Sequence, residues 1–305
     1  ALAAIWFFGA PALALMLVSV VFAVLSELVY EKITHQKTTI DDLSAVVTGL
    51  LLAFNLPANA PWWMAAIGSI IAIVLVKQMF GGIGQNFINP ALAARTILML
   101  SWAGLIAATA LPAGGQLFGL TTVPVDAVAS ATPLVSSSYS LWQLFIGDVP
   151  GMLGETCKLT LILGGVYLIV RKVIDWRIPV FFIATAFILF WIQTGVIYSV
   201  ESGTDNALYQ ILSGGLLLGA FFMATDYVTS PVSKWGKVVM GIGCAVILFV
   251  IRAYNNSYPE GCSFAILFMN VLTPLIDKWT MPRTFGAVKP AKAKKSEAKQ
   301  GGAKA

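Results

Sequence analysis

The chain has 305 residues, of which 58% are hydrophobic and only 11% are charged, and its mean hydropathy is +0.84. Soluble domains carry roughly 25% charged residues, so this composition excludes an ordinary soluble enzyme or binding domain. The net charge of +5 does not indicate a nucleic-acid partner, because six lysines lie in an Ala/Lys-rich tail beyond Gly286 and most other basic residues sit at the ends of apolar runs.

Apolar runs of about 20 residues recur along the chain, and a helix of that length crosses a bilayer. Their uninterrupted Leu, Val and Ile content favours helices over the alternating pattern of a membrane barrel, so we predict an all-α polytopic protein surrounded by membrane lipid. The first run is short, and we expect its helix to begin upstream of the sequence. The ten expected helical segments are Ala1–Phe8, Pro11–Tyr30, Leu43–Leu56, Trp62–Phe80, Pro90–Ala110, Glu155–Val173, Pro179–Val196, Ala207–Thr225, Lys237–Ile251 and Cys262–Ile276.

The distribution of Lys and Arg predicts the orientation of these segments. If they alternate across the membrane, one side receives most of the basic residues, and the other receives little beyond Lys158 and Arg252. Lys and Arg favour cytoplasmic loops. We therefore expect a disordered, cytoplasmic basic tail at residues 283–305, and we expect the loop at residues 113–154 to lie outside the cytoplasm.

Two halves, residues 1–112 and 155–282, repeat each other weakly. The third segment of each half, Leu43–Phe54 and Leu212–Phe222, carries glycine and is followed by proline. Because each half has an odd number of segments, the halves would be related by inverted topology, and broken helices at matching positions would mark a binding site near the midplane. Chance similarity between Leu/Gly-rich membrane segments is the alternative.

The polar loop contains the octapeptide Asp126-Ala-Val-Ala-Ser-Ala-Thr-Pro133. It resembles the flavin-attachment sequence of the RnfD proteins of Rnf complexes and of the NqrB proteins of the related sodium-pumping quinone reductase. Those proteins carry FMN as a phosphoester on the threonine of a pattern close to Asp-Gly-x-(Ser/Thr)-(Gly/Ala/Ser)-Ala-Thr. Ala127 stands where the pattern has glycine, and Ala129 where it has a hydroxyl residue. The positions that fit are Asp126, Ser130, Ala131 and Thr132. An ordinary Ser/Thr-rich turn is the alternative.

The resemblance to RnfD also covers Leu43–Pro57, Lys77–Ala94 and Asn270–Arg283. It implies a fold related to urea and ammonium channels, in the cytoplasmic membrane of a bacterium or archaeon. It implies a complex that moves electrons between ferredoxin and NAD and couples this to Na⁺ or H⁺ transport. It further implies covalent FMN at Thr132, attached by an FMN transferase, and a noncovalent riboflavin between the repeats. The implied partners are iron–sulfur subunits and another covalent-flavin subunit.

Polar residues near two helix starts are further candidates for the flavin site. Gly84, Asn86 and Asn89 precede the fifth segment, where glycine permits close backbone approach and Asn89 is a good N-cap. The free N–H groups of a helix start attract an anion or a polarised ring oxygen, and Arg95 would add positive charge. These residues either line a flavin or form a packed helix break. Glu155, before the sixth segment, either contacts the cofactor or is explained by the helix dipole.

Other chemistries have little support in the sequence. The three cysteines are scattered without a C-x-x-C spacing and His35 is the only histidine, so we expect no iron–sulfur, zinc or bis-histidine haem site built by this chain alone. The acidic residues lie in loops or near helix ends, so we expect no chain of buried carboxylates and no complete ion relay. A channel or transporter for small solutes or ions, without redox activity, is the alternative function.

Overall fold

The computed structural model describes residues 1–109, 112, 133–134, 139–198, 206–254 and 260–282. Within these ranges the chain is helical, and the one strand-like pairing is an isolated bridge between Pro57 and Met152. The predicted all-α class is therefore confirmed.

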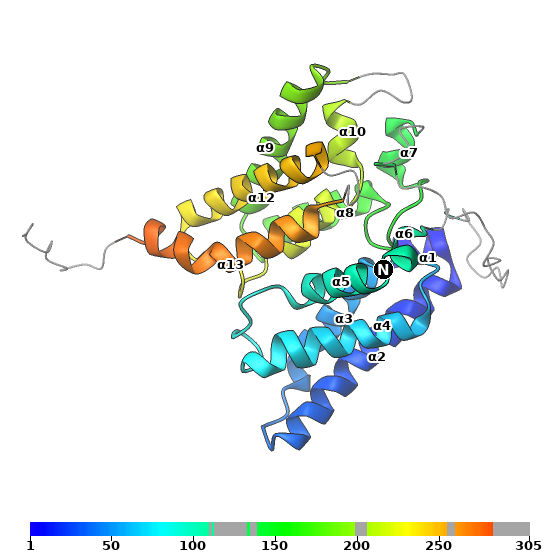
Figure 1. The fold of residues 1–305 in the computed structure, drawn as a ribbon, viewed down its shortest axis with the longest axis vertical. Coiled ribbons are helices and arrows are strands. Elements are labelled where there is room, and N and C mark those ends of the chain that lie inside the picture. The colour runs from blue at the N-terminus through cyan, green and yellow to red at the C-terminus, as the bar shows by residue number, and fades with distance from the viewer. Residues whose placement is uncertain (110–111, 113–132, 135–138, 199–205, 255–259, 283–305) are drawn as a thin grey trace, which may run out of the picture.

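The first half of the chain forms the lower part of the molecule in Figure 1. Its helices are α1 (Leu2–Phe8), α2 (Ala10–Ile33), α3 (Ser44–Phe54), α4 (Trp62–Ile70), α5 (Pro90–Ser101) and α6 (Ala103–Ala107). Helix α4 continues as a π-helical stretch, Ile71–Lys77, and ends in a 3-10 turn at Gln78–Phe80. Helix α2 packs against α3 and α4, and α5 covers the same two helices.

The second half forms the upper part. Its helices are α7 (Leu141–Ile146), α8 (Lys158–Val170), α9 (Arg177–Thr194), α10 (Ala207–Leu212), α11 (Leu216–Leu218), α12 (Lys234–Tyr254) and α13 (Cys262–Thr280). Helix α11 runs on as a π-helical stretch to Met223. Helix α12 packs against α9 and α13, and α13 contacts α5, so that α5 and α13 join the two halves (Figure 1).

The structure has a helix at the position of each predicted segment but differs in the details. The predicted segment Ala207–Thr225 is broken between α10 and α11, because Ser213 is extended (φ −91°, ψ 144°) and Gly214 is left-handed (φ +63°). Helix α8 starts at Lys158 rather than Glu155, and the short helix α7 was not expected.

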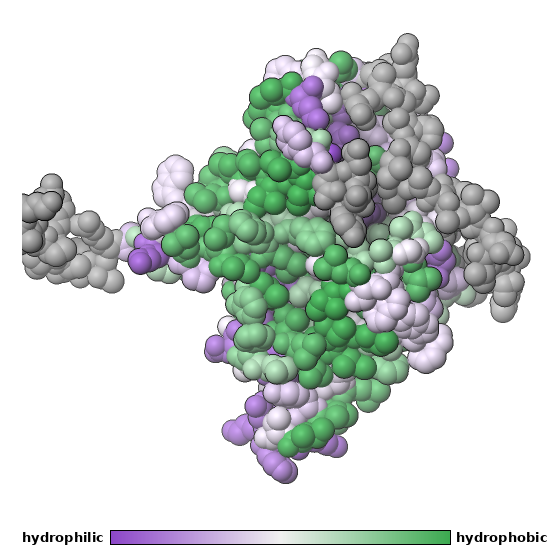
Figure 2. Space-filling view, in the orientation of Figure 1, coloured by the Kyte–Doolittle hydropathy of each residue, from purple (hydrophilic) through white to green (hydrophobic). Residues whose placement is uncertain are grey.

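Four helical stretches are long and apolar enough to span a membrane: α2, Trp62–Phe80, α9 and α12. Their outward faces carry large apolar side chains, and on α2 Leu17, Val21 and Leu25 are each about half exposed. Figure 2 shows hydrophobic residues over the middle of this face and hydrophilic residues near its ends. A soluble protein would bury such a surface, so these features indicate an integral membrane protein.

A second contact between the halves depends on the absence of a side chain at Gly154. Its backbone N–H donates to the carbonyl oxygen of Phe54 (2.9 Å), and the N–H of Leu153 donates to that of Leu56 (3.0 Å). These bonds satisfy carbonyls that the end of α3 leaves free. A Cβ atom on Gly154 would lie 2.3 Å from the Cβ of Phe54, so a larger residue cannot fit without a shift of α3.

Gly154→Ala should therefore lower the free energy of unfolding by about 1–3 kcal/mol, the usual cost of overpacking. The measurement is denaturant-induced unfolding of the purified protein in detergent. Gly104→Ala is the matched control, since nothing lies within 4 Å of a Cβ there and alanine suits a helix. Equal stability of the two variants would contradict the packing described for Gly154.

Candidate functional site

The predicted attachment residues Asp126, Ser130, Ala131 and Thr132 lie outside the described residues. The described chain resumes at Pro133, which directly follows Thr132 in sequence. The carbonyl oxygen of Pro133 accepts a hydrogen bond from the hydroxyl of Tyr209 on α10 (3.0 Å). The side chain of Leu134 lies against Gly214, with its Cδ1 2.8 Å from where a Cβ would stand. This end of the loop therefore contacts the break between α10 and α11.

Five ionisable side chains gather near this break, and we call them the five-charge cluster. Four of these residues are at most 9% exposed, and the fifth, Arg252, is partly buried. The members are Arg95, Glu155, Lys158, Arg252 and Glu260. The sequence predicted a site role for Arg95 and Glu155 but none for the other three. The signal available for these three was a charged residue at the very end of an apolar run.

Arg95 links the two halves of the molecule. From α5 its guanidinium forms an ion pair with Glu260 and donates a hydrogen bond to Ser263 in the first turn of α13. The Nε of Arg95 and the Oε1 of Glu260 have no hydrogen-bond partner among the described residues. The pair thus fixes α5 against α13 while leaving buried polar atoms open.

Lys158 and Arg252 hold the carbonyl groups at the broken helix. The Nζ of Lys158 donates to the backbone oxygens of Glu155 and Gly214, the latter at 2.9 Å. Arg252 donates to the backbone oxygens of Gln210 (2.5 Å) and Ser213 (3.2 Å). An interrupted helix leaves such carbonyls without intrahelical partners, and cations satisfy them. Two positive charges are thereby fixed beside the chain end at Pro133.

The Asn-Pro stretch has the capping geometry that the sequence predicted. The Oδ1 of Asn89 accepts from the N–H of Leu92 (3.2 Å), and its Nδ2 donates to the carbonyl of Met223 in the second half (3.3 Å). Asn86 bonds the carbonyl of Ile88 (3.0 Å). Gly84 has a φ of +84°, a conformation that suits glycine, and does not line the groove described next.

A groove of about 540 Å³ lies between the two halves, near the starts of α3 and α5. Its polar lining residues include Thr48, Asn86, Asn89 and Asp226, and its apolar lining includes Phe221. The predicted site residues therefore fall into two places. Asn86 and Asn89 line this groove, whereas Arg95 and Glu155 belong to the five-charge cluster. Arg95 follows Asn89 by six residues, or about 9 Å along α5.

The expectation of no buried carboxylates is wrong, because Glu155, Glu260, Glu27 and Glu31 are all buried. Glu27 lies on α2, more than one turn before the helix ends, and is fully buried. Proximity to a helix end in the sequence did not report burial here, because neighbouring helices and the following loop cover this end of α2.

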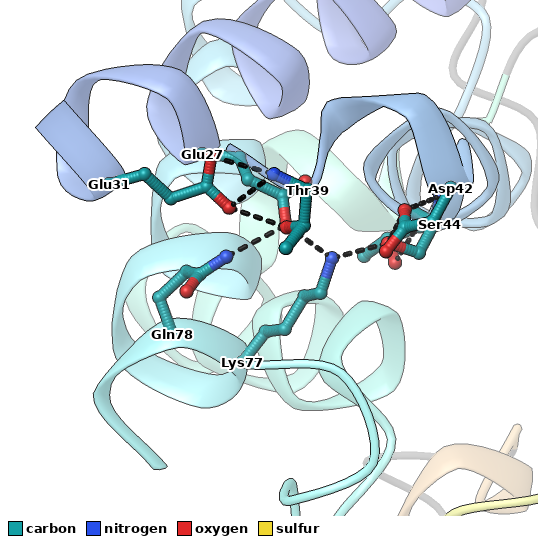
Figure 3. Close-up of polar contacts among 8 residues, drawn as sticks. Glu27, Glu31, Thr39, Asp42, Ser44, Lys77 and Gln78 are labelled. Atoms are coloured by element: carbon teal, nitrogen blue, oxygen red, sulfur yellow. Dashed lines mark hydrogen bonds and ion pairs between the residues drawn. The ribbon is translucent and has the colours of Figure 1, made fainter. Parts of the chain in front are cut away.

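Glu27 is paired with Lys77 in a second buried cluster (Figure 3). The Nζ of Lys77 donates to Oε1 of Glu27 (2.6 Å) and to Oγ of Ser44 (2.5 Å), and Gln78 donates to the same Glu27 oxygen (2.7 Å). Glu31 accepts from the hydroxyl of Thr39 (2.5 Å), which also contacts Glu27 (3.3 Å). We call Glu27, Glu31, Thr39, Ser44, Lys77 and Gln78 the Glu27–Lys77 cluster.

The model of the NQR2, RnfD, RnfE family matches residues 1–286. The chain is 46% identical over 299 residues to the RnfD subunit of the Na⁺-translocating ferredoxin:NAD⁺ oxidoreductase complex of Acetobacterium woodii, covering 95% of this chain and 87% of the relative. It is 40% identical over 295 residues to the corresponding subunit of the proton-translocating ferredoxin:NAD⁺ oxidoreductase complex of Clostridium ljungdahlii (92% and 85%). It is 38% identical over 314 residues to that of the ion-translocating oxidoreductase complex of Halorhodospira halophila (92% and 86%). The chain therefore belongs to the NQR2, RnfD, RnfE family, and the resemblance to RnfD inferred from its sequence is confirmed.

Proposed function

We propose that this protein is the electron-transfer RnfD subunit of an ion-translocating ferredoxin:NAD⁺ oxidoreductase complex and carries FMN esterified to Thr132. The observation that carries the proposal is similarity over more than nine-tenths of the chain to subunits named for such complexes. Relatives named for Na⁺ and for protons are both similar, so we propose ion coupling without choosing the ion. Iron–sulfur centres and the other covalent flavin would belong to partner subunits.

The polar atoms near Pro133 fit a flavin tether on the preceding residue. The Nε atoms of Arg95 and Arg252 are buried donors without partners among the described residues, and they suit an anionic or polar group. Bound FMN would supply one-electron transfer, while the protein fixes its position and surrounds it with chosen polarity. Threonine has no base beside it in sequence, so attachment would require an FMN transferase outside the cytoplasm.

A matching pair of contacts supports two inverted five-helix repeats. In the first half Lys77, near the end of the fourth helix, donates to Ser44 at the start of the third. In the second half Arg252, near the end of α12, donates to the carbonyl of Ser213 beside the broken third helix. Each serine follows a leucine in the two segments that align. Inverted repeats would put these contacts on opposite sides of the membrane, with the Thr132 loop outside and the basic tail inside.

The groove between the halves supports a second, noncovalent flavin. Its volume of about 540 Å³ lies within the usual range of small-molecule sites, roughly 300–1,000 Å³. Asn86, Asn89 and Thr48 offer hydrogen bonds, and Phe221 and Phe222 offer apolar surface for a ring. We propose riboflavin as its occupant.

Covalent flavin is tested directly on a denaturing gel. The purified subunit should show a fluorescent band, and Thr132→Ala should abolish that fluorescence because it removes the hydroxyl that forms the proposed ester. Thr121→Ala, in the same loop but outside the octapeptide, is the control and should stay fluorescent. Intact mass should show one FMN phosphodiester in the wild type and none in Thr132→Ala.

A colourless, non-fluorescent subunit would contradict the proposal. If that subunit also made liposomes permeable to small polar solutes, a channel would be the better function. Fluorescence that survives Thr132→Ala would place the flavin on another residue.

A further inference from the structure

The five-charge cluster contains more positive than negative charge. Arg95, Lys158 and Arg252 are cations, and only two carboxylates, Glu155 and Glu260, lie among them in the described part of the chain. Charged groups at membrane depth are costly unless they are paired, and they are usually retained for a function. Lys158 is 2% exposed, and its ammonium donates to two backbone carbonyls. The balance of charge therefore calls for one more anion.

The unpaired hydrogen-bonding groups point the same way. Arg95 and Arg252 each keep a buried Nε–H without a partner among the described residues, and Ser213 keeps a buried hydroxyl. Guanidinium groups offer planar sets of donors that match the oxygens of a phosphoryl group. The free donors come from α5, α12 and the break after α10, so they surround the site from three elements.

The backbone at Gly214 leaves room for an anion to approach. This residue has a φ of +63°, and a Cβ there would lie 3.2 Å from Nη2 of Arg252 and 2.8 Å from Leu134. A side chain at this position would therefore cover the Arg252 guanidinium. The carbonyl of Pro133 is held by Tyr209 beside the same break.

We propose that the five-charge cluster binds one phosphodiester group, with Lys158 and Arg252 as its positioning cations and Arg95 held for it by Glu260. A phosphodiester carries a single negative charge and therefore balances the excess. The inference rests on the proposed function, because FMN esterified to the residue before Pro133 would supply this group. A phospholipid headgroup has the same chemistry, and the experiment separates the two sources.

The test uses the assembled complex purified with Thr132→Ala in this subunit, so that no tethered flavin fills the site. Free FMN and free riboflavin are titrated, and binding is followed by quenching of flavin fluorescence. FMN should bind about tenfold more tightly than riboflavin, the effect of one hydrogen bond between charged groups. Adding Lys158→Met should remove that preference, Lys158→Arg should keep it, and Lys278→Met, at an exposed lysine, should not change it.

The lipid source is tested in the complex with Thr132 intact. Phospholipid retained after detergent washing is counted for the wild type and for Lys158→Met. Loss of one phospholipid for each subunit, without an FMN preference in the first experiment, assigns the site to a headgroup. Equal binding of FMN and riboflavin together with unchanged phospholipid overturns the inference. A wild-type subunit without covalent flavin would refute the proposed function alone, since both experiments can still be read.

Discussion

Replacing Glu27 with alanine should lower the free energy of unfolding by about 3–5 kcal/mol, the usual cost of breaking a buried ion pair from one side. The substitution leaves Lys77, whose side chain is 4% exposed, without its carboxylate and leaves Gln78 without an acceptor. Both are held in the stretch that continues α4, so the loss should loosen α2 from α4. The measurement is denaturant-induced unfolding in detergent.

The matched control removes both charges. Glu27→Leu combined with Lys77→Met should recover most of the lost stability, because an apolar pair of similar size often replaces a buried ion pair at little cost. A double-mutant cycle over these two positions gives their coupling energy. A cost below about 1 kcal/mol for Glu27→Ala would mean that the pair behaves as an exposed surface ion pair.

Arg95→Met should have an effect of similar size, about 3–5 kcal/mol, because it leaves Glu260 buried without its counter-charge. Since Arg95 joins α5 to α13, the variant should also separate the two halves more readily. Limited proteolysis between the halves should then become faster, and unfolding should shift to lower denaturant concentration. Adding Glu260→Gln should restore part of the stability.

Arg177→Met is the comparison for this prediction. Arg177 also pairs with a carboxylate, Asp175, but both side chains are more than 20% exposed, so its loss should cost less than about 1 kcal/mol. If the two arginine variants were equally stable, the link between α5 and α13 would not be important for the fold.

The sequence predicted the helices well because each apolar run is a local signal that does not depend on partners. The same holds for Asn89, whose capping role follows from an Asn-Pro pair at a helix start. The break at Gly214 was missed, although two adjacent glycines mark it, because the apolar run continues across it. Hydropathy averages over the backbone conformation that a single glycine changes.

The candidate site could be predicted only in part. Arg95 and Glu155 were selected because each lies near a helix start. The partner of Arg95, Glu260, is 165 positions away, and Glu27 is 50 positions from Lys77. Such pairings depend on the rotation and height of packed helices, which no local pattern reports. Burial of the carboxylates was missed for the same reason.

The π-helical stretch Ile71–Lys77 has a consequence for how this chain tolerates changes in length. Each residue of an α-helix turns the next by about 100°, so a single deletion there would swing the ammonium of Lys77 away from α2. A wider turn of this kind accommodates one extra residue and often occurs where a side chain must be aimed. Insertions and deletions within this turn should therefore be selected against more strongly than conservative apolar substitutions.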